Sequence, residues 1–203
     1  QIFAMAGRVT KRDEKTAAAI FESLLLTGIA MSFTKTSRPG SGTEHIMAHF
    51  WECMELLDSK TPNYHGEDVG VTTLIMLRYY EALARLPQVT AHPEICNWDE
   101  IYSIYGPLAP DVQKLNTPDT ITDGIAPRWI EACWPQIRRI VQSVPSYDAC
   151  LAAMRQAGCK TTIEEVGKAP DFVDISFRFH PYMRRRLSLK RVSHMLDLPE
   201  DLF

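Results

Sequence analysis

Apolar residues recur at helical spacing along most of this 203-residue chain. From Thr10 to Met31, a charged first turn is followed by apolar residues three or four positions apart, which predicts a helix. Thr43 has the side chain of an N-cap for a second helix that continues to about Leu57. A long third helix is expected from about Gly66 to Leu86, so helical periodicity dominates the first half of the chain.

Shorter helices are expected in the second half, where proline and glycine interrupt the pattern. The predicted segments are Trp98–Tyr105, Ala126–Val144, Ser146–Ala157, Ala169–Leu187 and Ser188–Leu196. The inner face of the second of these is expected to carry Trp129, Ile130, Trp134, Ile137 and Ile140. Thr162 and Glu165 have the spacing of a capping box. Because neither alternating strand patterns nor internal repeats are found, the sequence predicts one all-α domain over residues 1–203.

The composition is that of an ordinary folded domain, with 45% hydrophobic and 23% charged residues. A net charge of −3 gives no support to a nucleic-acid or anionic-membrane partner. The best apolar run, Ala17–Phe33, is interrupted by Glu22 and Gly28, so no membrane span is expected. The five cysteines are odd in number and form no C-x-x-C pair, which favours reduced thiols in a cytoplasmic protein.

Three of the six histidines lie in one short stretch, at positions His45, His49 and His65. The first two are four residues apart and share one helix face. A helix–loop–helix hairpin would bring His65 back beside His45. An isolated histidine pair of this kind is more often structural, but its combination with a Gly- and Ser-rich loop and an HGE segment favours a site for zinc or ferrous iron.

These motifs resemble the polyol-dehydrogenase and dehydroquinate-synthase superfamily, and most closely the sn-glycerol-1-phosphate dehydrogenase family. The family pattern SRP-x-SG-x-EH-x-x-x-H-x-WE appears at Ser37–Glu52, and HGE-x-VG appears at His65–Gly70. The resemblance covers nearly the whole chain and is weakest over Pro87–Gly124. It implies the multihelical C-terminal metal-binding domain of the dehydroquinate synthase-like or iron-containing alcohol dehydrogenase fold, with the N-terminal Rossmann-like NAD(P)-binding domain absent from this chain.

The resemblance also implies a role for individual residues. His45 and His65 would bind one divalent metal, either zinc or else iron or nickel, with a carboxylate from the absent domain as a further ligand. His49 would be the catalytic residue that hydrogen-bonds the substrate or relays its proton. Arg38 and Ser41 would bind the substrate phosphate, the alternative being an ordinary exposed loop.

Two glutamates adjoin the proposed ligands in the sequence. Glu44 precedes His45, and Glu67 follows His65 by two positions. Each can orient an imidazole as an outer partner of the metal site, or simply form a solvated acidic helix start.

The function implied for the complete enzyme is NAD(P)-linked interconversion of dihydroxyacetone phosphate and sn-glycerol 1-phosphate, for phospholipid biosynthesis. The chain alone is expected to be inactive, and a homo-oligomer is expected. Two alternatives remain: a glycerol dehydrogenase-like enzyme for an unphosphorylated polyol, and a non-catalytic helical metal-binding or interaction domain. Dehydroquinate synthase is disfavoured because its GHT-x-x-HAIE run is replaced by TEHIMAHFWE.

Overall fold

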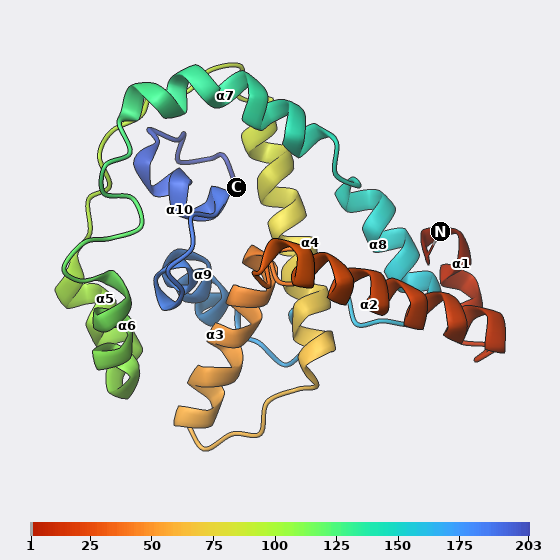
Figure 1. Cartoon of the computed structure of the whole chain (residues 1–203). Coiled ribbons are helices and arrows are strands. Elements are labelled where there is room, and N and C mark those ends of the chain that lie inside the picture. Colours follow the sequence, from red (N-terminus) through yellow and green to blue (C-terminus); the bar gives the residue numbers. More distant parts are fainter. Residues whose placement is uncertain (1) are drawn as a thin grey trace.

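The computed structural model describes residues 2–203, and all regular secondary structure in that range is helical (Figure 1). The α-helices are α1 (Ile2–Val9), α2 (Glu14–Thr34), α3 (Thr43–Leu57), α4 (His65–Arg85), α5 (Trp98–Tyr105), α6 (Ala109–Asn116), α7 (Pro127–Gln142), α8 (Tyr147–Gln156), α9 (Pro170–Phe179) and α10 (Leu189–Val192). Three short 3-10 helices occupy Gly106–Leu108, His180–Met183 and Ser193–Met195. An isolated antiparallel bridge joins Ala91 to Leu196. The all-α prediction is therefore confirmed.

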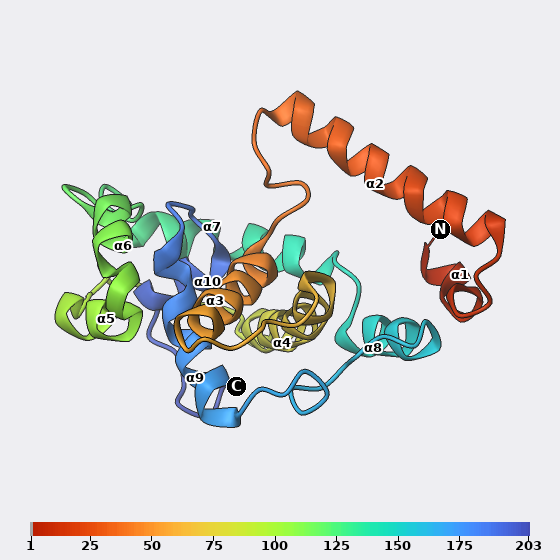
Figure 2. The same cartoon turned by 90° about the horizontal axis from the view of Figure 1, so that it is seen from below.

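The α3–α4 hairpin is the centre of the molecule, and both views show its two helices side by side (Figures 1 and 2). Its core face carries Met47, Phe50 and Trp51, none of which is exposed to solvent. The indole Nε1 of Trp51 donates a 2.7 Å hydrogen bond to Ser176 Oγ on α9. This apolar face fixes α3 against α9 and turns the opposite face of α3 outward.

A second apolar cluster forms where α7 crosses the far end of α4. Ile130 and Trp134 are buried there, and Trp134 Nε1 donates to the carbonyl of Leu86 at 2.9 Å. The prediction that Trp129 and Ile140 share this inner face was wrong, since they are 55% and 60% exposed. At 100° per residue, both lie about 80–100° around the helix from the buried row.

The end of the chain departs from the predicted long helices. The helix expected over Ala169–Leu187 ends at Phe179, because Pro181 lacks an amide hydrogen and its ring blocks a continuing α-helix. The hydrogen bonds of the predicted capping box form between Thr162 and Glu165, but they close a turn rather than a helix.

The start of the chain shows two further differences. Helix α1 was not predicted. Gly42, not Thr43, precedes α3, and Thr43 Oγ1 instead accepts a 2.9 Å hydrogen bond from the Tyr80 hydroxyl of α4.

A charged pair is buried between α10 and the segment that precedes α5. Glu94 Oε1 lies 2.7 Å from Arg191 Nε, and Glu94 Oε2 accepts a 2.6 Å hydrogen bond from Thr122. Nearby, burial lowers the pKa of His180 to about 3, so this imidazole stays neutral at ordinary pH. His180 is fully buried and the His194 side chain is 18% exposed, so these two histidines, which carry no motif in the sequence, pack within the fold.

Helix α2 extends away from the body of the molecule (Figure 2). Six of its large apolar residues are exposed: Phe21, Leu24, Leu25, Leu26, Ile29 and Phe33. The helix is long and apolar enough to cross a membrane by length and composition, contrary to the sequence-based expectation; core helices of soluble proteins and signal sequences meet the same criterion.

Both ends of α2 are attached to the same body. At one end, α1 packs against α8, which in turn packs against α4. At the other end, the loop after α2 is bound by Arg186. A 21-residue helix is about 32 Å long, so a bilayer crossing would separate these two attachments by the full membrane thickness.

Candidate metal and substrate site

The outer side of the α3–α4 hairpin presents the three histidines that the sequence singled out. His45 and His49 lie one turn apart on α3, and His65 is the first residue of α4. The ring centroids of His45 and His65 are 5.4 Å apart, and those of His49 and His65 are 4.8 Å apart and stacked. The hairpin thus gathers all three imidazoles within reach of one small ligand.

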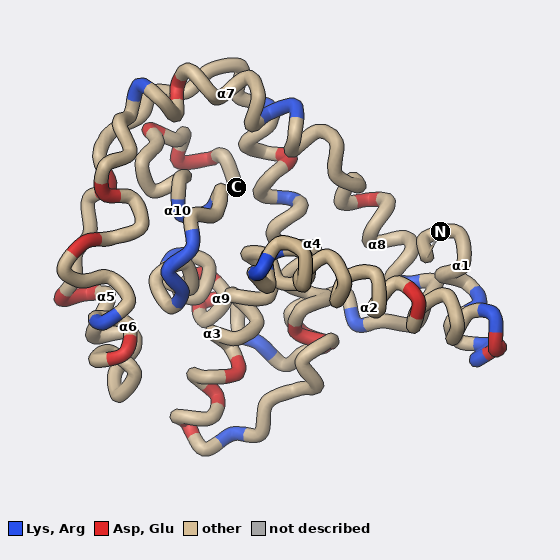
Figure 3. The backbone as a smooth tube through the Cα atoms, in the orientation of Figure 1, with Lys and Arg blue, Asp and Glu red and all other residues tan. Residues whose placement is uncertain are grey.

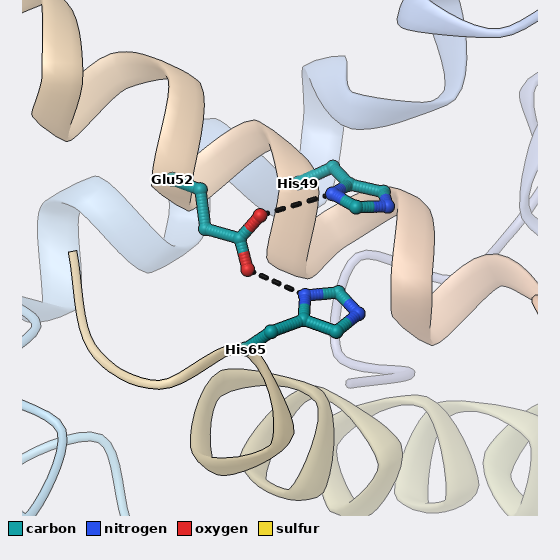
Figure 4. A group of neighbouring side chains, drawn as sticks. All are labelled: His49, Glu52 and His65. Carbon is teal, nitrogen blue, oxygen red and sulfur yellow. Dashed lines mark hydrogen bonds and ion pairs between the residues drawn. The ribbon is translucent and has the colours of Figure 1, made fainter.

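Glu52 joins two of these imidazoles, and the sequence analysis did not single it out. Its carboxylate accepts from His65 Nδ1 at 2.6 Å and from His49 Nδ1 at 3.0 Å (Figure 4). The available signal was its position three residues after His49, on the same helix face. Together, one donor atom from each of His49, Glu52 and His65 lies within 4.8 Å of the others, a spacing suitable for a metal ion.

The two glutamates that were singled out behave differently. Glu44 Oε1 lies 2.9 Å from His45 Nδ1 and also accepts from the Gly42 amide at 2.9 Å. Glu67 instead forms a 2.9 Å ion pair with Lys160, so it does not orient His65. Of these two glutamates, Glu44 hydrogen-bonds to a histidine ring of the site and Glu67 does not.

Both carboxylates that contact the histidines are held in the ionised state. Partial burial alone would raise the pKa of Glu52, but the hydrogen bonds from His65 and His49 outweigh it and lower the pKa. The pKa of Glu44 is lowered in the same way, with burial opposed by the hydrogen bonds from His45 and the backbone. Ionised carboxylates accept hydrogen bonds only, so each ring Nδ1 must carry the proton.

Buried polar contacts fix the hairpin beneath the site. Lys168 Nζ lies 2.5 Å from Glu55 on α3 and 3.5 Å from Asp68 on α4, and the Lys168 side chain is 1% exposed. Asn63, in the connecting loop, donates to Asp68 at 3.1 Å and to the carbonyl of Val166 at 2.8 Å. These contacts set the start of α4 and therefore the position of His65.

The loop that carries Arg38 and Ser41 leads directly into α3. Arg186 Nη1 donates to the Ser41 carbonyl at 2.7 Å, and its Nη2 contacts Ser37 Oγ. Arg186 belongs to the basic run at residues 184–186, visible as a blue stretch between α9 and α10 (Figure 3). Nothing in the sequence connects this run to the loop, because 145 positions separate Arg186 from Ser41.

The structure places Arg38 and Ser41 near the start of α3 but does not join them to the histidines. Arg38 is exposed, and Ser41 is partly buried. Within residues 2–203, no hydrogen bond or ion pair links either side chain to His45, His49 or His65. Their predicted role in phosphate binding stays a prediction.

The donor set suits a divalent transition metal. In the described range, every Nδ1 of the three histidines faces a carboxylate, and no hydrogen bond involves any of the three Nε2 atoms. A neutral imidazole with its proton on Nδ1 has its lone pair on Nε2, which is the form that ligates zinc or iron. The carboxylate partners are the outer contacts that metal-binding histidines commonly have.

The curated proteins that match this chain carry the name of the family that the motifs resemble. The chain is 26% identical over 190 residues to a glycerol-1-phosphate dehydrogenase [NAD(P)+] of Geobacillus stearothermophilus, covering 94% of this chain and 40% of that relative. The enzyme of that name from Thermoplasma volcanium is 25% identical over 162 residues, covering 78% of this chain and 40% of the relative. A third, from Thermococcus kodakarensis, is 39% identical over 64 residues, covering 32% of this chain and 17% of the relative.

The chain therefore spans about two fifths of the length of the curated relatives that match nearly all of it. No family model matches the chain, and no solved structure matches it.

Proposed function

Because this chain is a relative of the NAD(P)-dependent glycerol-1-phosphate dehydrogenases over nearly its whole length, we propose that it is the C-terminal, metal- and substrate-binding half of such an enzyme. The complete enzyme would interconvert dihydroxyacetone phosphate and sn-glycerol 1-phosphate in the cytoplasm, for phospholipid biosynthesis, as a homo-oligomer. The observation that carries the proposal is the gathering of His45, His49 and His65 on the α3–α4 hairpin.

In this proposal, His45 and His65 hold a divalent metal, with zinc the first choice and iron or nickel the alternatives. The free Nε2 atoms and the carboxylate-held Nδ1 atoms support it. When bound, such an ion supplies Lewis-acid polarisation of a substrate oxygen. Two histidines leave coordination positions open, so a further carboxylate ligand would come from the rest of the enzyme.

The substrate would lie between the histidines and the loop before α3. His49 stacks on His65 and is hydrogen-bonded to Glu52, so its Nε2 can accept a proton from the substrate hydroxyl or hydrogen-bond to it. Arg38 and the Ser41 hydroxyl would bind the phosphate, since a guanidinium offers two parallel donors to a phosphate group. The two contacts from Arg186 hold this loop in place.

The remaining length of the relatives would supply the nicotinamide site and cover α2. Helix α2 exposes apolar residues around much of its circumference, and a helix of that kind is normally buried in a protein core or a membrane. Because both ends of α2 are attached to one body, a membrane crossing by this helix is disfavoured. We therefore propose that α2 packs against the N-terminal nucleotide-binding half, whose NAD(P)H supplies the hydride.

A fusion protein tests this function. The unmatched part of the Geobacillus stearothermophilus relative would be joined to this chain and assayed for NAD(P)H oxidation with dihydroxyacetone phosphate. We expect activity from the fusion and none from this chain alone, because residues 2–203 form an all-helical unit without a Rossmann-like nucleotide-binding fold. The proposal is wrong if the fusion binds both NAD(P)H and zinc but does not reduce the substrate. Equal activity on unphosphorylated dihydroxyacetone would instead support a polyol dehydrogenase.

Arg38→Ala in the same fusion is expected to raise the KM for dihydroxyacetone phosphate with little change in kcat. The reason is that a phosphate contact far from the reacting carbon binds substrate and transition state alike. Losing a charge-assisted hydrogen bond of about 1.5–3 kcal/mol corresponds to a roughly 10- to 150-fold rise in KM. Steady-state kinetics give both constants, and Arg139→Ala on α7 is the control. An unchanged KM would return Arg38 to the role of an ordinary exposed loop residue.

A further inference from the structure

The three histidines of the site share one hydrogen-bonding arrangement, although they come from two helices. Glu44 holds the Nδ1 of His45, while Glu52 alone holds the Nδ1 of both His49 and His65. Figure 4 shows the Glu52 carboxylate to one side of both rings, joined to one nitrogen of each, with the second nitrogen of each ring pointing away from it. One side chain therefore determines the orientation of an imidazole on α3 and of another on α4.

The consequence is chemical as well as geometric. A neutral imidazole carries its proton on either nitrogen, and the nitrogen without the proton is the ligand or base. In water, a free histidine side chain favours the proton on Nε2, which would leave that atom unable to bind a metal or accept a proton. A carboxylate at Nδ1 reverses this preference, because it accepts a hydrogen bond only from a protonated nitrogen.

We propose that Glu52 is the positioning residue of the site, which holds His49 and His65 in the Nδ1–H tautomer and so presents two Nε2 lone pairs on the same open side. This inference rests on the proposed function for its purpose, but the tautomer it predicts exists without any metal or substrate. Glu52 acts through the two imidazoles and does not itself contact the reacting groups.

The surroundings of Glu52 suit this role. Its side chain is 17% exposed, and it is the more shielded partner in both contacts, since the side chains of His49 and His65 are 35% and 45% exposed. His65 follows a seven-residue connection between α3 and α4. Within the described residues, the contact with Glu52 is the hydrogen bond that joins its ring to α3. A carboxylate with two oxygens is needed, because each oxygen serves a different ring.

Nitrogen NMR of the metal-free chain tests the proposal directly. Long-range proton–nitrogen correlation spectra distinguish the two tautomers of each histidine at a pH where the rings are neutral. We expect the Nδ1–H tautomer for His45, His49 and His65 in the unchanged protein. In Glu52→Ala, His49 and His65 should change to mainly Nε2–H while His45 keeps its tautomer. Glu44→Ala is the matched control and should change His45 alone.

A zinc titration supplies the second measurement. Glu52→Ala is expected to weaken zinc binding by about 10- to 100-fold, the range seen when outer partners of ligating histidines are removed. Glu52→Asp, which keeps the carboxylate, should recover part of the tautomer preference. A merely structural effect would change the His45 signals too, and unchanged helical circular dichroism excludes unfolding.

Two results would overturn the inference. The first is a Glu52→Ala protein in which both histidines keep the Nδ1–H tautomer. The second is a zinc complex in which both Nδ1 atoms lose their protons, because Glu52 would then share metal ligation with them. If the tautomers behave as expected but the unchanged chain and the fusion bind no zinc, the proposed function fails and the role of Glu52 in holding the rings stands.

Discussion

Replacing His65 with alanine is expected to abolish zinc binding by this chain. His65 is the one histidine that lies close to both others, with ring centroids 5.4 Å from His45 and 4.8 Å from His49. Its loss removes a ligand and also releases one oxygen of Glu52. Loss of an outer partner alone lowers metal affinity by about 10- to 100-fold, so loss of a ligand should lower it further. Because this chain offers few other ligands, the zinc affinity of the variant should fall below detection.

Competition with a chromophoric chelator gives the affinities. His92→Ala is the control, because His92 lies in the loop after α4 and bonds to the neighbouring Pro93 carbonyl. Zinc affinity that survives His65→Ala undiminished would exclude this histidine as a ligand.

The same titration assigns the second ligand. The family resemblance implies that the second ligand is His45. In the structure, however, the side chains with ligand atoms within 4.8 Å of one another are His49, Glu52 and His65. Under our proposal, His45→Ala lowers zinc affinity as severely as His65→Ala, and His49→Ala lowers it little. The opposite order would place the metal between His49 and His65 and leave His45 as the substrate-facing residue.

The sequence predicted those parts of the site that depend on local spacing. The helical period places His45 and His49 on one face, and the proline- and asparagine-containing loop before His65 predicts the hairpin. Glu52 was on the same face, yet nothing in a single sequence separates a glutamate that binds two rings from one that is merely solvated. Its role depends on how far α4 returns towards α3, which is a tertiary distance.

The contacts that were missed join distant parts of the chain. Arg186 reaches Ser41 across 145 positions, and Lys168 reaches Glu55 across 113. Helical periodicity contains no information on such pairs. It also failed at Trp129, because a bulky apolar residue was expected to be buried although it lies about one quarter-turn from the buried row of α7. The fold class was predictable because it needs only local pattern.

The largest effect on stability is expected from Glu94→Ala. The Glu94 and Arg191 side chains are 3% and 0% exposed, and their Oε1 and Nε atoms are 2.7 Å apart. The Arg191 guanidinium also lies 4.0 Å from the centre of the Tyr182 ring, which helps to enclose it. Removing the carboxylate leaves a buried arginine charge without its counter-ion, a change that typically costs about 3–5 kcal/mol.

Urea denaturation measures the change as the difference in the free energy of unfolding. The same substitution at Glu100 is the matched control, because its 3.2 Å ion pair with Arg178 is exposed and such pairs contribute at most about 1 kcal/mol. Glu94→Gln should lie between the two, since its amide oxygen can still accept from Arg191 Nε while the charge is lost. Near-equal stability of the Glu94→Ala and Glu100→Ala proteins would contradict the prediction and would show that the Arg191 guanidinium becomes hydrated when its partner is removed. A large difference would mean that Glu94 anchors the C-terminal segment through Arg191. Because Arg186 lies on the same short stretch of chain and contacts the loop before α3, the Glu94–Arg191 pair would then also help to hold that loop.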